Sequence, residues 1–274
     1  MKINVNGRVQ DAEEARISVL DHGFLFGDSV YEVLRVRNGI LQSYDEHFAR
    51  LQESAAFIRL SLPHDSAFYL REIHRTCSAL GASEAAVRWI VTRGVGALSL
   101  SPAGCLPGFV IIAWPLDFTS IPPFVKLVTV RGITSDQLAV DPRIKTGNRL
   151  PHVLAMHQAQ LAEVYEALLK NRAGYLAEGL SSSLFFVRGY QLCTPSLEAG
   201  ILNGVTRRRV LDAAQRLGIA TEEGMYREAA LAGAAAVFIC SSTRGIVPAD
   251  AVDDRRYDSR SNQVLASLDR QIEK

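Results

Sequence analysis

The chain has 274 residues, of which 48% are hydrophobic and 22% are charged, the ordinary mix of a soluble globular protein with a sizeable core. Thirty basic residues balance 29 acidic ones, which leaves a formal net charge of +1 at pH 7. Nucleic acid or an anionic membrane would attract a strongly positive protein, so we expect neither as the main partner.

The cysteines and the apolar stretches indicate in which cellular compartment the protein is expected. No two cysteines form a CxxC pair, which argues against a disulfide framework and favours a reduced, cytoplasmic compartment; the four are Cys77, Cys105, Cys193 and Cys240. The first residues turn polar too soon for a signal peptide. The most apolar stretch, residues 229–240, is far shorter than the roughly 20 residues that cross a bilayer. We therefore expect a cytoplasmic protein without a membrane partner.

The first half of the chain predicts strands and helices in mixed order. Asn-Gly dipeptides at Asn6 and Asn38 suit tight hairpin turns, the second of them after a strand over residues 30–36. Ser43 begins a helix with apolar residues at helical spacing: Phe48, Leu51, Ala55 and Ile58. A second helix runs from Asp65 to Gly81. Strands are expected over residues 85–92 and 109–114.

Three prolines between residues 115 and 123 mark the domain boundary that we expect, because the intervening residues show no period. Beyond it the pattern predicts a strand over 125–130, a helix from Leu150 through Leu168, and strands over 175–187 and 191–193. A helix follows Gly204 and ends at Gly218, and a buried strand covers 238–240. We predict two α+β domains, residues 1–118 and 119–274, with a ligand site between them.

Several common catalytic motifs are missing from the sequence. It contains no GxGxxG after an early strand, no GxxxxGK[ST] and no GxSxG elbow, which disfavours a dinucleotide-binding domain, a P-loop and a serine hydrolase. His152 and His157 are not arranged as HExxH, so we expect no metal site.

A few residues suggest anion binding and base chemistry. The glycine turn at Gly204 leads into a helix whose free N–H groups could bind a phosphate, and Ser241 and Ser242 could add hydroxyls. Lys145 is a candidate for covalent chemistry. Taken singly, each has an ordinary alternative: a helix cap before a solvated basic face, a polar turn, or a surface charge. Arg50 and Glu178 are equally ambiguous alone.

Six segments, taken in order, resemble the class IV, fold-type IV pyridoxal-phosphate aminotransferases over nearly the whole chain. This family includes branched-chain and D-amino acid aminotransferases, (R)-amine transaminases and aminodeoxychorismate lyases. The segments are DHGFLFGDSVYE (21–32), HFARL (47–51), IKTGNRL (144–150), EGLSSSLF (178–185), GILNGVTR (200–207) and SSTRGIVP (241–248). The resemblance implies a two-domain α+β fold with the active site between the domains and the catalytic lysine in the C-terminal one.

The resemblance also implies roles for individual residues toward pyridoxal 5'-phosphate. Lys145 would bind the cofactor covalently and then move the proton of the substrate Cα. Glu178 would pair with the pyridine nitrogen, and Leu202 would press on the ring. The phosphate would be held by Arg50, the backbone N–H groups of Val205 and Thr206, and Ser241 or Ser242. One departure is Ser183, which stands where the family usually has asparagine.

The substrate class depends on the strand after Asp28. Tyr31 would line the pocket, and Val33 is similar to the D-amino acid enzymes, whereas branched-chain enzymes typically have glycine there. D-amino acid aminotransferases carry an arginine and a histidine after the segment matching residues 92–94, but residues 95–100, which include Leu98, have neither. Another cation is needed for a carboxylate; the candidates are Arg35, Arg93 and Arg149.

We therefore rank the activities implied by the resemblance. A D-amino acid aminotransferase with a non-standard carboxylate trap comes first, followed by a branched-chain L-amino acid aminotransferase, an (R)-amine transaminase and a lyase. A non-catalytic binding protein on the same scaffold is the alternative outside enzymes. The partners would be an amino acid and a 2-oxo acid, and the family suggests a homodimer.

Overall fold

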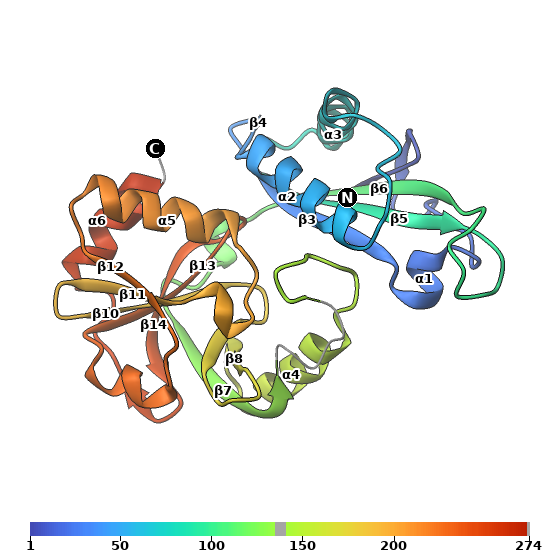
Figure 1. The fold of residues 1–274 in the computed structure, drawn as a ribbon. Helices are drawn as coiled ribbons and strands as arrows, with labels where there is room; N and C mark the ends of the chain where they lie inside the picture. The colour runs from blue at the N-terminus through green and yellow to red at the C-terminus, as the bar shows by residue number, and fades with distance from the viewer. Residues whose placement is uncertain (135–140, 273–274) are drawn as a thin grey trace. The chain divides into compact units, whose positions relative to one another are not determined.

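The computed structural model describes residues 1–134 and 141–272 (Figure 1). Contacts divide the chain into two compact units. Unit 1 comprises Met1–Phe118 together with Ile144–Asn148, and unit 2 comprises Thr119–Arg143 together with Arg149–Lys274.

Unit 1 is built on a six-stranded antiparallel sheet in the order β2-β1-β6-β5-β3-β4. Its elements are β1 (Lys2–Val5), β2 (Arg8–Asp11), α1 (His22–Phe26), β3 (Ser29–Arg37), β4 (Ile40–Leu41), α2 (Tyr44–Phe57), α3 (Ser66–Leu80), β5 (Ala85–Val95) and β6 (Leu106–Pro115). The two predicted hairpins are confirmed. Asn6 and Asn38 adopt φ of 49° and 51° at the β1–β2 and β3–β4 turns, the left-handed region that asparagine tolerates.

Helices α2 and α3 lie on one face of this sheet (Figure 1). The strand residues that face the helices alternate with those on the other face, so β5 contributes Val87, Trp89 and Val91 to the core. On β3 the same alternation places Val30 and Leu34 in the core and leaves Tyr31 and Val33 on the opposite face.

The segment Ile144–Asn148 packs against β3 although it follows unit 2 residues in the chain. The Tyr31 N–H donates to the Lys145 carbonyl at 3.0 Å, and the Gly147 N–H donates to the Ser29 carbonyl at 2.9 Å. Val30 and Thr146 form an antiparallel bridge. The sequence assigned Lys145 to the C-terminal domain, whereas these backbone hydrogen bonds group it with unit 1.

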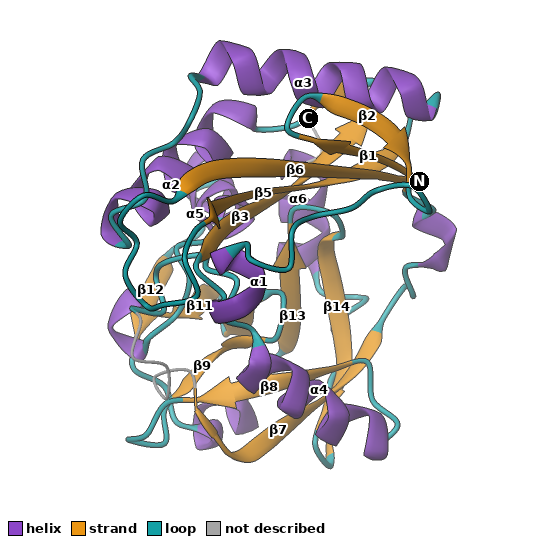
Figure 2. Cartoon of the chain, turned by 90° about the vertical axis from the view of Figure 1, so that its right-hand side faces the viewer, coloured by secondary structure: helices purple, strands orange, loops and turns teal. Residues whose placement is uncertain are grey.

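Unit 2 contains a nine-stranded mixed sheet in the order β12-β11-β10-β13-β14-β7-β8-β9, with β15 paired to β14. Its strands are β7 (Val125–Thr134), β8 (Glu166–Lys170), β9 (Leu176–Gly179), β10 (Ser183–Arg188), β11 (Gln191–Pro195), β12 (Thr221–Gly224), β13 (Ala236–Ser241), β14 (Gly245–Val252) and β15 (Arg255–Arg256). Its α-helices are α4 (Leu150–Leu161), α5 (Val205–Arg216) and α6 (Gln263–Ile272). Figure 2 shows α4 beside β7 and β8. Helices α5 and α6 pack together over Phe185 and Phe238 of the sheet.

The predicted helix from Leu150 through Leu168 is wrong in its second half. Helix α4 ends at Leu161, Glu163 adopts φ of 53°, and Leu168 is a fully buried residue of β8. Leu168 fits the helical spacing, but pairing of β8 with β7 and β9 decides its conformation. None of the described helices is long and apolar enough to cross a bilayer.

Candidate active site

Lys145 lies beside the face of the unit 1 sheet that points away from α2, next to Tyr31. Its Nζ is 4.7 Å from the centre of the Tyr31 ring, and its backbone N–H donates to Ser54 Oγ at 3.2 Å. With the Tyr31 N–H on its carbonyl, the lysine backbone is held from both sides. Its ammonium position is therefore set by side-chain rotamers on a fixed backbone.

Arg88 of β5 contacts the same aromatic ring. Its guanidinium carbon is 4.0 Å from the centre of the Tyr31 ring, a cation–π distance. The register pairs Arg88 with Val33, so both lie on the sheet face that carries Tyr31. Sequence reasoning missed Arg88. The available signal was its alternation with Val87 and Trp89, which places it on the other face from these core residues of β5.

A buried ionic cluster lies on the opposite face of β3. Glu32, with no exposed surface, accepts hydrogen bonds from Arg50 Nε at 2.7 Å and Arg50 Nη2 at 2.6 Å, and its Oε2 lies 2.6 Å from His47 Nδ1. Burial by itself would raise the pKa of Glu32, but Arg50 and His47 outweigh it and hold that pKa at about 2. Burial lowers the pKa of His47; Glu32 acts in the opposite direction, and Arg50 and Lys145 add to the lowering.

The cluster bears on the predicted phosphate role of Arg50. Two of its three guanidinium nitrogens donate to Glu32, so the carboxylate fixes the plane of the guanidinium and offsets its charge. His47, Arg50 and Ser54 follow one another at helical spacing on α2, and this polar stripe therefore holds both β3 and the Lys145 segment.

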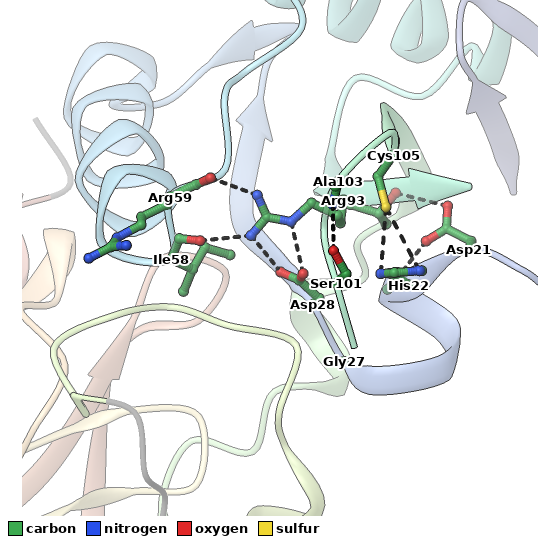
Figure 3. A network of polar contacts seen from close by, with 12 residues as sticks. Asp21, His22, Gly27, Asp28, Ile58, Arg59, Arg93, Ser101, Ala103 and Cys105 are labelled. Atoms are coloured by element: carbon green, nitrogen blue, oxygen red, sulfur yellow. Dashed lines mark hydrogen bonds and ion pairs between the residues drawn. The ribbon is translucent and has the colours of Figure 1, made fainter. Parts of the chain in front are cut away.

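Arg93, which the sequence offers as a candidate carboxylate trap, binds groups of unit 1 (Figure 3). Its Nε and Nη2 donate to the Asp28 carboxylate at 2.8 and 3.1 Å. Its Nη1 and Nη2 also donate to the carbonyls of Arg59 and Ile58, both at 2.7 Å. All three guanidinium nitrogens of Arg93 are therefore engaged within unit 1. Leu98 is 75% exposed on the loop that follows β5.

Arg35 shares the sheet face of Tyr31 and Val33, because it lies two residues beyond Val33 on β3 and pairs with Ala86. Arg149 belongs to unit 2, where it precedes α4 and its Nη2 donates to the Leu180 carbonyl. Of the three arginines named from the sequence, only Arg35 is on the sheet face that carries Arg88.

In unit 2, Glu178 at the end of β9 is 9% exposed and accepts a hydrogen bond from the Leu202 N–H at 3.0 Å. The structure thus brings together a buried carboxylate and the residue expected to press on the cofactor ring. The two residues are 24 positions apart in the sequence, so no local pattern predicts this contact.

The sequence predicts a phosphate site, the anion seat, at the start of α5. Its N-cap, Gly204, has no side chain to accept hydrogen bonds from the first-turn N–H groups, including those of Val205 and Thr206. Thr206 Oγ1 lies 3.3 Å from Ser242 Oγ. A Cβ at Gly204 would lie 2.9 Å from Ser183 Oγ, so the backbone approaches this strand closely. The site residues of unit 2 gather where β10 begins and β13 ends, since Ser183 pairs with Cys240.

Ser241, the last residue of β13, and Ser242, the first residue after it, differ in their surroundings. Ser241 Oγ accepts a hydrogen bond from Arg244 Nε at 2.9 Å, whereas Ser242 lies beside Thr206 at the helix start. Sequence reasoning named Ser241 and Ser242 together; the geometry favours Ser242 as the hydroxyl nearer the anion seat. Among the described residues, no group of histidine, cysteine and carboxylate side chains could hold a metal ion.

Comparison with known proteins defines the class. Residues 29–252 match the family model described as amino-transferase class IV. A Methanocaldococcus jannaschii protein, provisionally named a branched-chain-amino-acid aminotransferase, is 35% identical over 93% of this chain and 89% of its own length. The D-alanine aminotransferase of Bacillus licheniformis is 32% identical over 94% of this chain and 91% of its own length.

Solved structures agree with this classification. The branched-chain aminotransferase of Thermoproteus uzoniensis with norvaline superimposes with a TM-score of 0.91 at 26% identity, covering 99% of this chain and 93% of that one. Another branched-chain aminotransferase, solved with pyridoxamine 5'-phosphate, has a TM-score of 0.90 at 25% identity. The chain has the fold-type IV structure and belongs to the class IV aminotransferase family. The first of the two sequence relatives is named a branched-chain and the second a D-alanine aminotransferase, at similar identity.

Proposed function

We propose that the protein is a pyridoxal-phosphate-dependent aminotransferase that moves an amino group between an amino acid and a 2-oxo acid, with D-amino acids as the first substrate class. The observation that carries the proposal is in unit 1, where the amine of Lys145 and the cation of Arg88 both contact the ring of Tyr31. An amine that can move a proton and a cation that can hold a carboxylate are the two groups that an amino acid requires.

The residues present fit the cofactor. The glycine N-cap of α5 leaves first-turn N–H groups for a phosphate, and the Thr206 and Ser242 hydroxyls adjoin them. Glu178 offers a buried carboxylate for a protonated ring nitrogen. Pyridoxal phosphate, when bound, supplies an electron-withdrawing ring that stabilises negative charge at the substrate Cα.

The chain's own residues then perform the remaining steps. Lys145 Nζ would take the proton from the substrate Cα and hold it for return on the other side of the substrate nitrogen. Arg50, fixed by Glu32, contributes to phosphate binding, and Leu202 packs on the ring. Arg88 orients the substrate carboxylate with two parallel hydrogen bonds, a geometry that guanidinium groups favour.

Arg88 supplies the cation that the apolar loop over residues 95–100 lacks. Its place opposite Val33 disfavours an amine substrate without a carboxylate, since that would leave the cation with no anion. A branched-chain L-amino acid aminotransferase is the second candidate, favoured by the identity to the Methanocaldococcus jannaschii relative.

A half-reaction distinguishes the two. The cofactor-loaded protein is titrated with D-alanine and, separately, with L-leucine, while the visible absorbance of the lysine-bound cofactor is followed. We expect the band to disappear with D-alanine alone. Loss with L-leucine alone would establish the branched-chain alternative, and a band that neither amino acid changes would contradict the proposed substrates.

A further inference from the structure

Arg244 of unit 2 connects three segments of the chain near the anion seat. Its Nη1 donates to Glu166 Oε2 at 2.8 Å, and its Nε donates to Ser241 Oγ at 2.9 Å. Its Nη2 donates to Ser181 Oγ at 2.9 Å and to the Ser181 carbonyl at 3.1 Å. The guanidinium thus joins β8, the loop before β10 and the last residue of β13.

Glu166 completes the network from the other side. Its Oε1 accepts hydrogen bonds from the Ser181 N–H at 2.6 Å, from Ser181 Oγ at 3.2 Å and from Ser182 Oγ at 3.1 Å. The Glu166 side chain is 1% exposed and that of Arg244 is 15% exposed. Removing such a pair from water is costly and contributes little net stability, so stability alone is a weak reason for it.

Arg244 restricts the directions in which the Ser241 hydroxyl can donate. Ser241 Oγ accepts from Arg244, and therefore its single proton is directed elsewhere as a donor. The next residue, Ser242, lies 3.3 Å from Thr206 Oγ1 at the start of α5. Donors at this turn are what a phosphate requires. The carboxylate of Glu166 offsets the charge of Arg244. We therefore do not expect Arg244 itself to bind the phosphate.

The same contacts also set the distance between the end of β13 and the loop after Glu178. Ser181 and Ser182 follow Glu178 after Gly179 and Leu180, and the Gly179 N–H donates to the Ser182 carbonyl at 2.9 Å. Arg244 binds this loop and the turn that carries Ser242 at once. It therefore couples the carboxylate proposed for the ring nitrogen to the hydroxyl proposed for the phosphate.

We propose that Arg244 and Glu166 are positioning residues, which orient the Ser241 hydroxyl and hold the end of β13 and the following turn (residues 242–244) at a fixed distance from the Glu178 strand end, so that phosphate and ring are bound together. This inference rests on the proposed use of pyridoxal phosphate.

The test measures the affinity of the apoprotein for pyridoxal phosphate and for inorganic phosphate by calorimetry. Arg244→Lys keeps the ion pair with Glu166, but a single ammonium cannot serve Ser241, Ser181 and Glu166 together. We expect it to bind pyridoxal phosphate about 10- to 100-fold more weakly, the loss of one or two charge-assisted hydrogen bonds, with little change in melting temperature. Arg188→Lys, in the exposed pair with Glu222, is the matched control and should bind normally.

A double-mutant cycle separates positioning from mere structural support. If Arg244 acts through Ser241, Ser241→Ala combined with Arg244→Lys will weaken cofactor binding little more than one substitution alone. Normal binding by Arg244→Lys, or fully additive losses in the cycle, would overturn the inference. A wild-type protein that binds neither pyridoxal phosphate nor phosphate would instead contradict the proposed function, and this inference with it.

Discussion

Tyr31 is contacted by two cations that lie far apart in the sequence, Arg88 at 4.0 Å and Lys145 at 4.7 Å from the ring centre. An aromatic ring attracts a cation to its face but provides no counter-charge. The arrangement leaves the guanidinium of Arg88 suited to a ligand carboxylate. Its role therefore differs from that of Arg93, whose donors are bound to Asp28 and to two carbonyls.

We predict that Arg88→Gln raises the KM for the amino acid and the 2-oxo acid about 10- to 100-fold, because a hydrogen-bonded contact to a charged group is lost. The cofactor band of the variant should be normal. Steady-state kinetics with each substrate check this, with Arg71→Gln on α3 as the control, since its guanidinium lies 5.8 Å from the Phe68 ring, away from Tyr31. An unchanged KM would exclude Arg88 from carboxylate binding.

At the scale of elements, α2 combines a core-facing side with a polar stripe. The apolar spacing of Phe48, Leu51 and Ala55 predicts the helix, which the structure confirms as Tyr44–Phe57. The partner of the stripe could not be predicted, because Glu32 is 15 and 18 residues away from His47 and Arg50. The local sequence offers one indication. Glu32 lies in an otherwise apolar part of β3, and a carboxylate in such a strand is rarely buried without a charged partner.

The Glu32 cluster predicts acid sensitivity. A folded-state pKa of about 2 against an ordinary 4.5 stabilises the fold at pH values above 4.5, and this stability is lost as the pH falls through about 2. The difference corresponds to about 3 kcal/mol in the free energy of unfolding. The lowered pKa of His47 acts in the same direction, because the unfolded chain takes up that proton first as the pH falls below 6.5.

Melting temperatures measured from pH 7 to pH 3 check this expectation. Glu32→Gln should melt lower at pH 7, because Arg50 loses its counter-charge, and its melting temperature should then change less with pH than that of the wild type. Asp11→Asn, in the exposed pair with Lys2, serves as the control and should follow the wild-type curve closely. Parallel wild-type and Glu32→Gln curves would show that Glu32 does not set the acid response.

At the scale of the whole molecule, the order of six motifs predicted the family, because each motif is local in sequence. Contacts that join distant segments were not predictable. The Lys145 segment groups with unit 1 through hydrogen bonds to Ser29 and Tyr31, and Arg244 joins Glu166 across 78 residues. Such pairs depend on strand register and tertiary packing, for which a single sequence holds no local pattern.

The homodimer expected from the family resemblance can be tested at the exposed apolar side chains of α4. On α4, Leu150, Val153, Leu154 and Leu161 are each more than half exposed. Such a stripe on one helix is costly in water and is typical of a covered surface. We predict a mass near twice 30.0 kDa by light scattering, reduced to a single chain by Leu154→Glu. A wild-type protein of 30.0 kDa would contradict a dimer.

The identity of the lysine that carries the cofactor tests the account most directly. Cofactor-loaded protein is reduced with sodium borohydride, digested, and its peptides are analysed by mass spectrometry, with Lys145→Ala as the control. We predict a phosphopyridoxyl group on Lys145 and none on the variant. A label on any other lysine (Lys2, Lys126, Lys170 or Lys274), or no label on the wild type, would contradict the proposed mechanism.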